Sequence, residues 1–240
     1  APFLSPVLRA LVMAFDKYHQ KNMLILYDAV GTLADSVGPA LNQPEYIDML
    51  MQPLTARWAS LDDTDPDLIP LLECMASVTI AMGPGFQPHA VPVFQRCVNI
   101  IHQNLVAYEQ AMTQPSTADD ELPDRTFLIV ALDLLSGLCQ GLGVQSQELV
   151  ANVQPLILPQ LLPCLTNIEP PVRQSAFALL GDLAINAFPQ LKPYLSTHMP
   201  LILSQISPEQ MHETLSVCNN ATWAAGEIAL QSHSDPDFQV

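Results

Sequence analysis

Five segments of the chain share one pattern, and one position of that pattern holds three acids, an alanine and a tryptophan. Each segment has a small residue three places after that position, as in Asp28-Ala-Val-Gly31 and Trp223-Ala-Ala-Gly226. Carboxylates attract Lys and Arg side chains, and an indole ring offers a face to an apolar or cationic group. Together these residue types suit an extended peptide that is basic and partly apolar. The five positions are Asp28, Glu73, Asp133, Ala178 and Trp223.

The spacing of these positions predicts the architecture that carries them. Successive positions lie 45, 60, 45 and 45 residues apart. A repeat of this length is typical of stacked helix pairs, in which equivalent side chains of successive pairs line up. The longer interval contains residues 114–123, which lack helical periodicity and are rich in loop residues. We therefore predict an all-α solenoid of about five HEAT repeats, built from antiparallel helix pairs, with a loop insertion at about 114–123.

Apolar periodicity and the placement of Gly and Pro locate the individual helices. In residues 24–37, the apolar residues follow helical spacing, and Asp28, Thr32 and Asp35 form one narrow polar stripe. Glycine-containing motifs are expected to end second helices at residues 38–39, 83–85 and 141–143. We predict a single solenoid segment over residues 1–240, with pairs at about 1–40, 41–86, 87–143, 144–188 and 189–240. The helices are expected at 4–18 and 21–37, 44–61 and 66–82, 89–113 and 124–142, 146–166 and 169–187, and 190–206 and 209–231.

The charge balance limits the kinds of partner. Eight Lys and Arg residues face 24 acidic residues, for a net charge of −16 at pH 7. Proteins bind nucleic acids and anionic membranes through Lys and Arg, so neither is expected as a direct partner. A cationic partner is favoured, and solubility is the alternative role of such charge. Prolines interrupt the most apolar region, residues 153–165, which is therefore not expected to span a membrane.

No motif indicates catalysis, a metal or a cofactor. The six His residues form no HExxH motif, and no Cys/His cluster has zinc spacing. Asp28 and Asp35 are two helical turns apart, roughly 10 Å by helix rise, which does not by itself make a general acid–base pair. The five Cys residues are scattered through apolar helical contexts, as reduced buried cysteines of intracellular proteins are. We predict a protein that is not an enzyme and has no cofactor.

Several segments closely resemble the transportin (karyopherin-β2) family of nuclear import receptors. The runs that carry the resemblance are residues 22–37, 70–74, 129–138, 172–182 and 217–223, and it covers essentially the whole chain. The chain resembles a central-to-C-terminal stretch of that family's HEAT-repeat superhelix. The resemblance implies a receptor that shuttles between cytoplasm and nucleus and binds proline-tyrosine nuclear localisation signals of cargo proteins, often RNA-binding proteins. It also implies cargo release by Ran-GTP, which acts mostly outside these residues.

By position, the resemblance also implies which residues face the cargo peptide. One group would face the basic part of the signal, and the other would lie near its N-terminal hydrophobic or basic motif. The chain departs from the family seven residues after Asp133, where Gln140 replaces a Glu and so keeps hydrogen-bonding capacity but loses a charge. The first group is Ile25, Asp28, Thr32, Asp35 and Glu73, and the second is Asp133, Gln140, Gln174, Asp182, Leu215, Asn219, Asn220 and Trp223.

Other interpretations of these residues stay open. A HEAT-repeat scaffold of another class, such as a phosphatase regulatory subunit or another karyopherin, would share the fold but bind through different surfaces. On residue type alone, Trp223 would be a core residue and the acids a solvated helix face. The acidic run 119–121 indicates a solvated loop. The family's pocket for the proline-tyrosine dipeptide lies on earlier repeats, so we expect only part of a cargo groove here.

Overall fold

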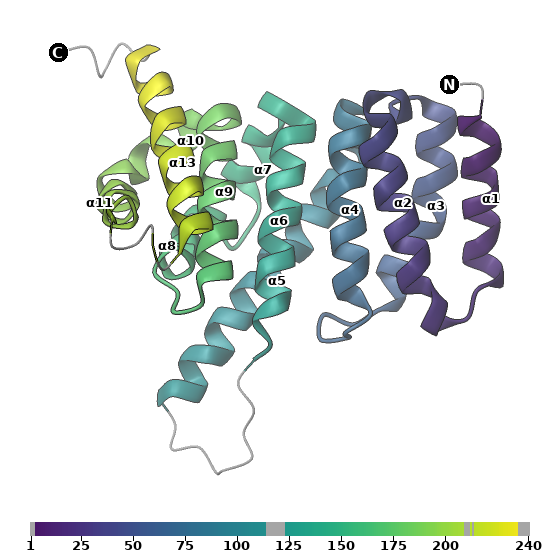
Figure 1. Ribbon diagram of the computed structural model, residues 1–240, viewed down its shortest axis with the longest axis horizontal. Coiled ribbons are helices and arrows are strands. Elements are labelled where there is room, and N and C mark those ends of the chain that lie inside the picture. Colours follow the sequence, from purple (N-terminus) through teal and green to yellow (C-terminus); the bar gives the residue numbers. More distant parts are fainter. Residues whose placement is uncertain (1–2, 114–122, 209–211, 213, 235–240) are drawn as a thin grey trace.

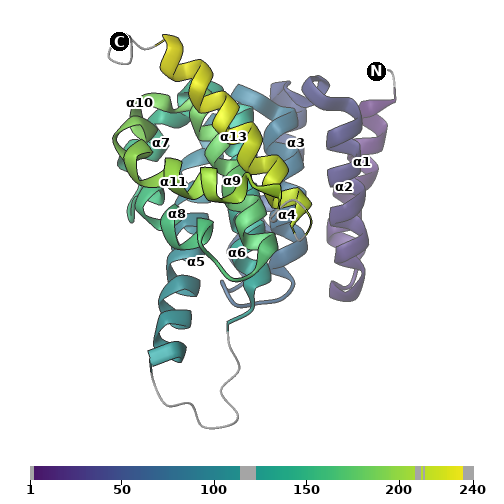
Figure 2. The ribbon, with the colours of Figure 1, turned by 60° about the vertical axis from the view of Figure 1, so that its left-hand side comes forward.

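The computed structural model describes residues 3–113, 123–208, 212 and 214–234. These residues form helices joined by turns, and no strand occurs among them. Figures 1 and 2 show the helices stacked in sequence order, from the purple N-terminal pair to the yellow C-terminal helix. Most of the predicted loop insertion at 114–123 lies outside the described residues.

The second helices of the pairs form a row in which each helix packs directly against the next. We call this the B row: α2 (Met23–Val37), α4 (Leu68–Met82), α6 (Arg125–Leu142), α9 (Pro170–Asn186) and α13 (Leu215–Ser234). The first helices form the A row: α1 (Leu4–Lys17), α3 (Pro44–Ser60), α5 (Gln87–Thr113), α7 (Ser146–Asn152) with α8 (Ile157–Leu165), and α10 (Phe188–Leu191) with α11 (Leu195–Gln205). This is the all-α solenoid that the repeat spacing predicts.

Three B-row helices end at a glycine with a left-handed backbone. Gly38, Gly83 and Gly143 have φ angles of 51°, 53° and 58° and cap α2, α4 and α6. Glycine adopts this conformation without the steric cost of a Cβ. A 3₁₀ turn begins at each glycine and leads to the next A-row helix. The three glycine motifs therefore end helices as predicted, except that Gly141 lies inside α6.

Two predicted A-row helices are broken in the structure. Residues 146–166 form α7 and α8, with Pro155 between them. Proline lacks a backbone N–H and disfavours helical geometry in the residue before it. Residues 190–206 include a 3₁₀ turn at Lys192–Tyr194, between α10 and α11. The other helices begin and end within two residues of prediction, apart from α13, whose predicted start lies in residues that the structure does not describe.

The core lies between and within the two rows. Its largest fully buried side chains include Phe86, Phe94 and Phe177, and all five cysteines are buried with free thiols, as predicted. Two helical stretches, Leu68–Thr113 and Arg125–Asn152, are long and apolar enough to cross a membrane by length and composition. However, 56% and 61% of their apolar windows are buried inside the protein, as expected for core helices of a solenoid.

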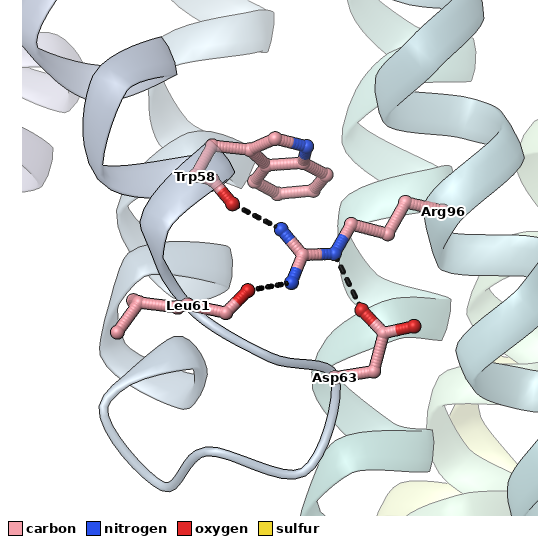
Figure 3. A network of polar contacts seen from close by, with 4 residues as sticks. All are labelled: Trp58, Leu61, Asp63 and Arg96. Atoms are coloured by element: carbon pink, nitrogen blue, oxygen red, sulfur yellow. Dashed lines mark hydrogen bonds and ion pairs between the residues drawn. The ribbon is translucent and has the colours of Figure 1, made fainter.

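Arg96 joins the A-row helices α3 and α5 (Figure 3). It donates hydrogen bonds to the backbone carbonyls of Trp58 and Leu61, at the C-terminal end of α3, and to Oδ1 of Asp63 at 2.6 Å. Its guanidinium lies 4.8 Å from the centroid of the Trp58 ring. The last carbonyls of a helix have no partner within the helix. Arg96 therefore satisfies these groups and fixes the joint between two helix pairs.

Three more arginines bind turns or neighbouring helices in a similar way. Arg57 donates to a backbone carbonyl near the end of α1, at 3.4 Å. Arg125 donates to Oδ1 of Asn104 at 2.9 Å, and Arg173 donates to the carbonyl of Asn167 at 2.6 Å. The chain has only eight Lys and Arg residues. Half of its cationic side chains therefore bind groups of neighbouring turns and helices within the chain.

We expect Gly141→Ala to lower the free energy of unfolding by about 1–3 kcal/mol, as overpacking does. A Cβ at Gly141 would lie 3.0 Å from the carbonyl carbon of Thr79 on α4 and closer still to its oxygen, and backbone atoms cannot rotate away. Urea denaturation followed by circular dichroism measures the loss. Gly31→Ala is the matched control, because its Cβ would meet nothing nearer than 3.7 Å. Equal losses in the two variants would contradict the prediction.

Candidate functional site

The first group of predicted site residues lies in a groove between α2 and α4. The groove has a volume of about 490 Å³. Its residues include Ile25, Asp28, Thr32 and Asp35 from α2, and Glu73 from α4. All five side chains are exposed, and Ile25 is 66% exposed. The structure therefore brings together every residue that the sequence predicts to face the basic part of a signal peptide.

Helical spacing explains how α2 can serve both the groove and the core. The groove residues of α2 follow one another at intervals of three or four residues, so they share one face. The opposite face carries Leu26, Val30 and Ala34, which are buried. Gly31 lies between the two helices, where a Cβ would be 3.7 Å from the Cα of Cys74 on α4. The groove is thus a narrow polar opening over closely packed helices.

The acids of the B row have no neutralising cation. Asp28, Asp35, Glu73 and Asp133 are exposed, and none has a Lys or Arg partner within the part of the chain that the structure describes. The ion pairs of Arg9 and Arg96 lie in the A row and in the turn that follows α3. Like charges without counter-charges create a negative potential that attracts cationic ligands.

Asp133 continues the row of acids on α6. Its side chain reaches solvent, but the neighbouring helices remove part of its hydration, which raises its pKa, and a hydrogen bond from Ser175 on α9 lowers it. Burial also raises the pKa of Glu73 on α4, with a further increase from the charge of Asp133. The two carboxylates therefore repel each other across the joint between α4 and α6. A cation placed there would stabilise both of them.

The structure does not expose Asp182, which was predicted to face the cargo. This residue is only 3% exposed, and its carboxylate accepts hydrogen bonds from the Ser136 hydroxyl and, at 3.1 Å, from Nε2 of Gln140. Burial raises the pKa of Asp182, the two hydrogen bonds lower it, and Glu227 raises it. Gln140 donates a hydrogen bond that an ionised Glu could not donate. Asp182 thus links α6 to α9 from inside the row, while Gln140 itself is exposed.

The remaining predicted residues gather on α13 and the facing end of α9. Leu215, Asn219 and Trp223 are spaced by four residues and form one exposed stripe of α13. Trp223 is 36% exposed, so it is not a fully buried core residue. Asn220 lies beside this stripe and donates a hydrogen bond to the backbone carbonyl of Gln174 at 2.9 Å. That bond ties α13 to α9, and the side chain of Gln174 is exposed.

Three residues with a part in this surface were missed by the sequence reasoning. Glu227 lies one turn after Trp223 and continues the stripe of α13. Ser77 lies one turn after Glu73 and lines the groove. The four-residue spacing could have found both. Ser175, which donates to Asp133, has no such signal, because the contact joins two helices. No group of His, Cys, Asp and Glu suited to hold a metal occurs among the described residues.

Comparison with known proteins shows which proteins this chain is similar to. No protein-family model matches the chain. Transportin-1 of Homo sapiens is 52% identical over 231 residues, which cover 96% of this chain. Transportin-1 of Oryza sativa subsp. japonica is 45% identical over 96% of the chain, and importin subunit beta-2 of Schizosaccharomyces pombe is 43% identical over 98%. The chain is a transportin homologue. It spans 25%, about a quarter, of the length of each of these relatives.

In this transportin homologue the predicted residues do not form a single cavity. The first group lines the groove between α2 and α4, and the exposed α13 stripe lies at the other end of the B row. Asp133 on α6 stands between them. A ligand that contacts both ends must therefore run along the B row and cross α6 and α9. An extended peptide has the shape to do so.

Proposed function

We propose that this chain forms part of the cargo-binding surface of a nuclear import receptor. In this proposal the B row binds an extended peptide that is basic over α2, α4 and α6 and apolar near α13. The observation that carries it is the groove of about 490 Å³, whose exposed carboxylates have no Lys or Arg partner among the described residues. The names of the relatives, transportin and importin, support the role in import.

The geometry of a helix row suits a peptide with regularly spaced cations. Neighbouring packed helices lie about 8–10 Å apart, and an extended chain advances about 3.3–3.6 Å per residue. Each step from one B-row helix to the next therefore corresponds to about three peptide residues. A peptide with Lys or Arg at every third position would meet Asp28, Glu73 and Asp133 in turn. Each exposed pair contributes about 0–1 kcal/mol, so affinity depends on several acting together.

The full proposal assigns the ligand class and the roles of the site residues. The ligands are proline-tyrosine nuclear localisation signals of cargo proteins, often RNA-binding proteins. Asp182, Gln140 and Asn220 hold the B row in shape, and the exposed predicted residues contact the peptide. We further propose that the receptor is non-catalytic and is built from the five helix pairs predicted above. It shuttles between cytoplasm and nucleus. Ran-GTP binds mainly to residues outside this chain and causes the receptor to release its cargo.

A titration with two matched peptides tests this function. The first labelled peptide carries Lys or Arg at every third position and an apolar N-terminal segment, and the second has Gln in place of each cation. Fluorescence anisotropy should detect tight binding of the first peptide only. At roughly 1 M salt, where the Debye length is about 3 Å, its affinity should fall by about ten-fold or more. Equal binding of the two peptides would overturn the proposal.

We expect binding of the basic peptide to weaken as the pH falls from neutral toward the raised pKa values of Glu73 and Asp133. Burial raises the pKa of Glu73 and of Asp133 in the free protein. A bound cation favours the ionised carboxylates and lowers both pKa values. The complex therefore holds fewer protons than the free protein, so binding releases protons and strengthens as pH rises.

Isothermal titration calorimetry in two buffers with different ionisation enthalpies measures this proton release. The double variant Glu73→Gln/Asp133→Asn is the control, because it lacks both titrating groups and should release fewer protons. Proton uptake by the parent protein on binding would contradict the prediction.

A further inference from the structure

The ring of Trp223 packs against α9 at the position of Gly181. A Cβ added to Gly181 would lie 2.5 Å from Cε3 and 2.8 Å from Cη2 of the indole, and closer still to Cζ3. Real Cβ atoms essentially never approach another heavy atom within 3.0 Å. Glycine is therefore the residue that allows the indole to lie this close to the helix axis. The rest of the ring reaches solvent, since Trp223 is 36% exposed.

The backbone at Gly181 does not itself require glycine. Gly181 lies inside α9, and the glycines with positive φ are Gly38, Gly83 and Gly143, all at helix ends. A glycine inside a helix is less favourable than an alanine by roughly 1 kcal/mol. Helix propensity alone would therefore favour alanine at position 181. The close contact with the Trp223 indole is the feature of the structure that favours glycine there.

The equivalent glycines of other B-row helices have no aromatic neighbour of this kind. A Cβ at Gly31 would meet ordinary contacts, the nearest at 3.7 Å, and a Cβ at Gly226 would meet nothing within 4 Å. The position three residues before Gly181 is Ala178, where three other helices carry an acid. Residues three apart share a helix face. Ala178 and Gly181 together leave a bare patch on α9, and the ring of Trp223 covers part of it.

We infer that Gly181 is a positioning residue for the peptide-binding surface, because it seats the Trp223 indole flat against α9. The seated ring presents its exposed part as a fixed platform for one apolar side chain of the bound peptide. A larger residue at position 181 would push the indole off α9 and remove the platform. The inference rests on the proposed function, since it assigns a role to α9 in the same peptide-binding surface.

Fluorescence tests the seating of the ring without any ligand. The chain has two tryptophans, so Trp58→Phe leaves Trp223 as the sole indole emitter. In that background, Gly181→Ala should shift the emission to longer wavelength and increase quenching by acrylamide, because the ring becomes more exposed. Gly226→Ala is the matched control, one turn from Trp223 on α13 and with open space around its Cβ. Equal emission and quenching in the two variants would overturn the inference.

A double-mutant cycle provides a second measurement that depends on the same contact. With Trp223 present, Gly181→Ala should lower the midpoint of thermal unfolding, because the added methyl group displaces the ring. With Trp223→Ala, the same substitution should raise the midpoint, since alanine favours the helix more than glycine does. A loss of the same size in both backgrounds would show that α9 rejects the methyl group for another reason and would overturn the inference.

Peptide binding then separates this inference from the proposed function. Two basic peptides are compared, one with Leu and one with Ala at the apolar position. The parent protein should prefer the Leu peptide by about five-fold, as expected for partial burial of the larger side chain, and Gly181→Ala should abolish the preference while keeping the salt dependence. If the parent binds neither peptide, the proposed function fails and the binding role of Gly181 fails with it. If the variant keeps both the preference and the emission of the parent, only the role of Gly181 is wrong.

Discussion

Replacement of Arg96 by alanine is expected to lower the free energy of unfolding by about 2–3 kcal/mol. The substitution removes the hydrogen-bond donors of the Trp58 and Leu61 carbonyls and the cation beside Asp63 (Figure 3). The side chains of Arg96 and Asp63 are only 15% and 32% exposed, so water replaces the lost contacts poorly. The loss of the contact with the Trp58 ring adds to the effect. Chemical denaturation monitored by circular dichroism measures the change.

Arg9→Ala is the matched control for this prediction. Arg9 pairs with Glu45 at 3.5 Å, and the two side chains are 65% and 64% exposed. An exposed pair of this kind contributes about 0–1 kcal/mol. A second variant, Arg96→Lys, keeps the charge but loses the planar fork that reaches several acceptors at once. If Arg96→Ala costs no more than Arg9→Ala, the joint between α3 and α5 does not depend on this network.

The triple variant Asp28→Asn/Asp35→Asn/Glu73→Gln is expected to weaken binding of the basic peptide by about 10- to 100-fold. Each lost attraction is worth up to about 1 kcal/mol, and three together approach 1.4–2.8 kcal/mol if they act on one peptide. Removing repelling carboxylates should leave the free protein at least as stable as the parent. Anisotropy titrations at low salt give the affinity, and thermal unfolding checks the fold.

Three acids of the A row provide the control for net charge. Asp16, Asp48 and Glu109 are exposed on α1, α3 and α5, so Asp16→Asn/Asp48→Asn/Glu109→Gln changes the total charge equally without touching the groove. This variant should bind the peptide within about three-fold of the parent, because screening weakens distant charges. Equal losses in the two triple variants would mean that the peptide responds to overall charge and that the groove is not its binding site.

The groove of α2 could be predicted from sequence because its residues repeat at helical spacing within one element. Asp182 was assigned to the cargo-facing surface by the family resemblance, and it lies four residues after Ala178, as Thr32 lies four residues after Asp28 in α2. Five residues lie four places after the repeated position of their helix. In the structure Thr32 is exposed, Ser77 and Glu227 are half-buried, and Gly137 and Asp182 are buried. Periodicity defines the face of a helix, but the width of the exposed strip depends on the neighbours on both sides.

Contacts between helices explain the other differences. Arg96 binds backbone carbonyls, which every residue carries, so no residue pattern could indicate its partners. The seat of Trp223 depends on a glycine 42 positions earlier in the chain, and sequence alone could not distinguish this glycine from Gly31 or Gly226. The break between α7 and α8 does have a local cause, since Pro155 was visible in the sequence.

Added salt acts on the exposed acids of the B row in two opposite ways. Four arginines bind groups of neighbouring turns and helices, whereas the exposed acids of the B row have no Lys or Arg partner among the described residues. Added salt screens the mutual repulsion of those acids and so favours the folded state of the free protein. The same salt weakens the attraction for a basic peptide. The surface without a ligand therefore stores electrostatic repulsion, which a basic peptide relieves on binding and which returns when the peptide leaves.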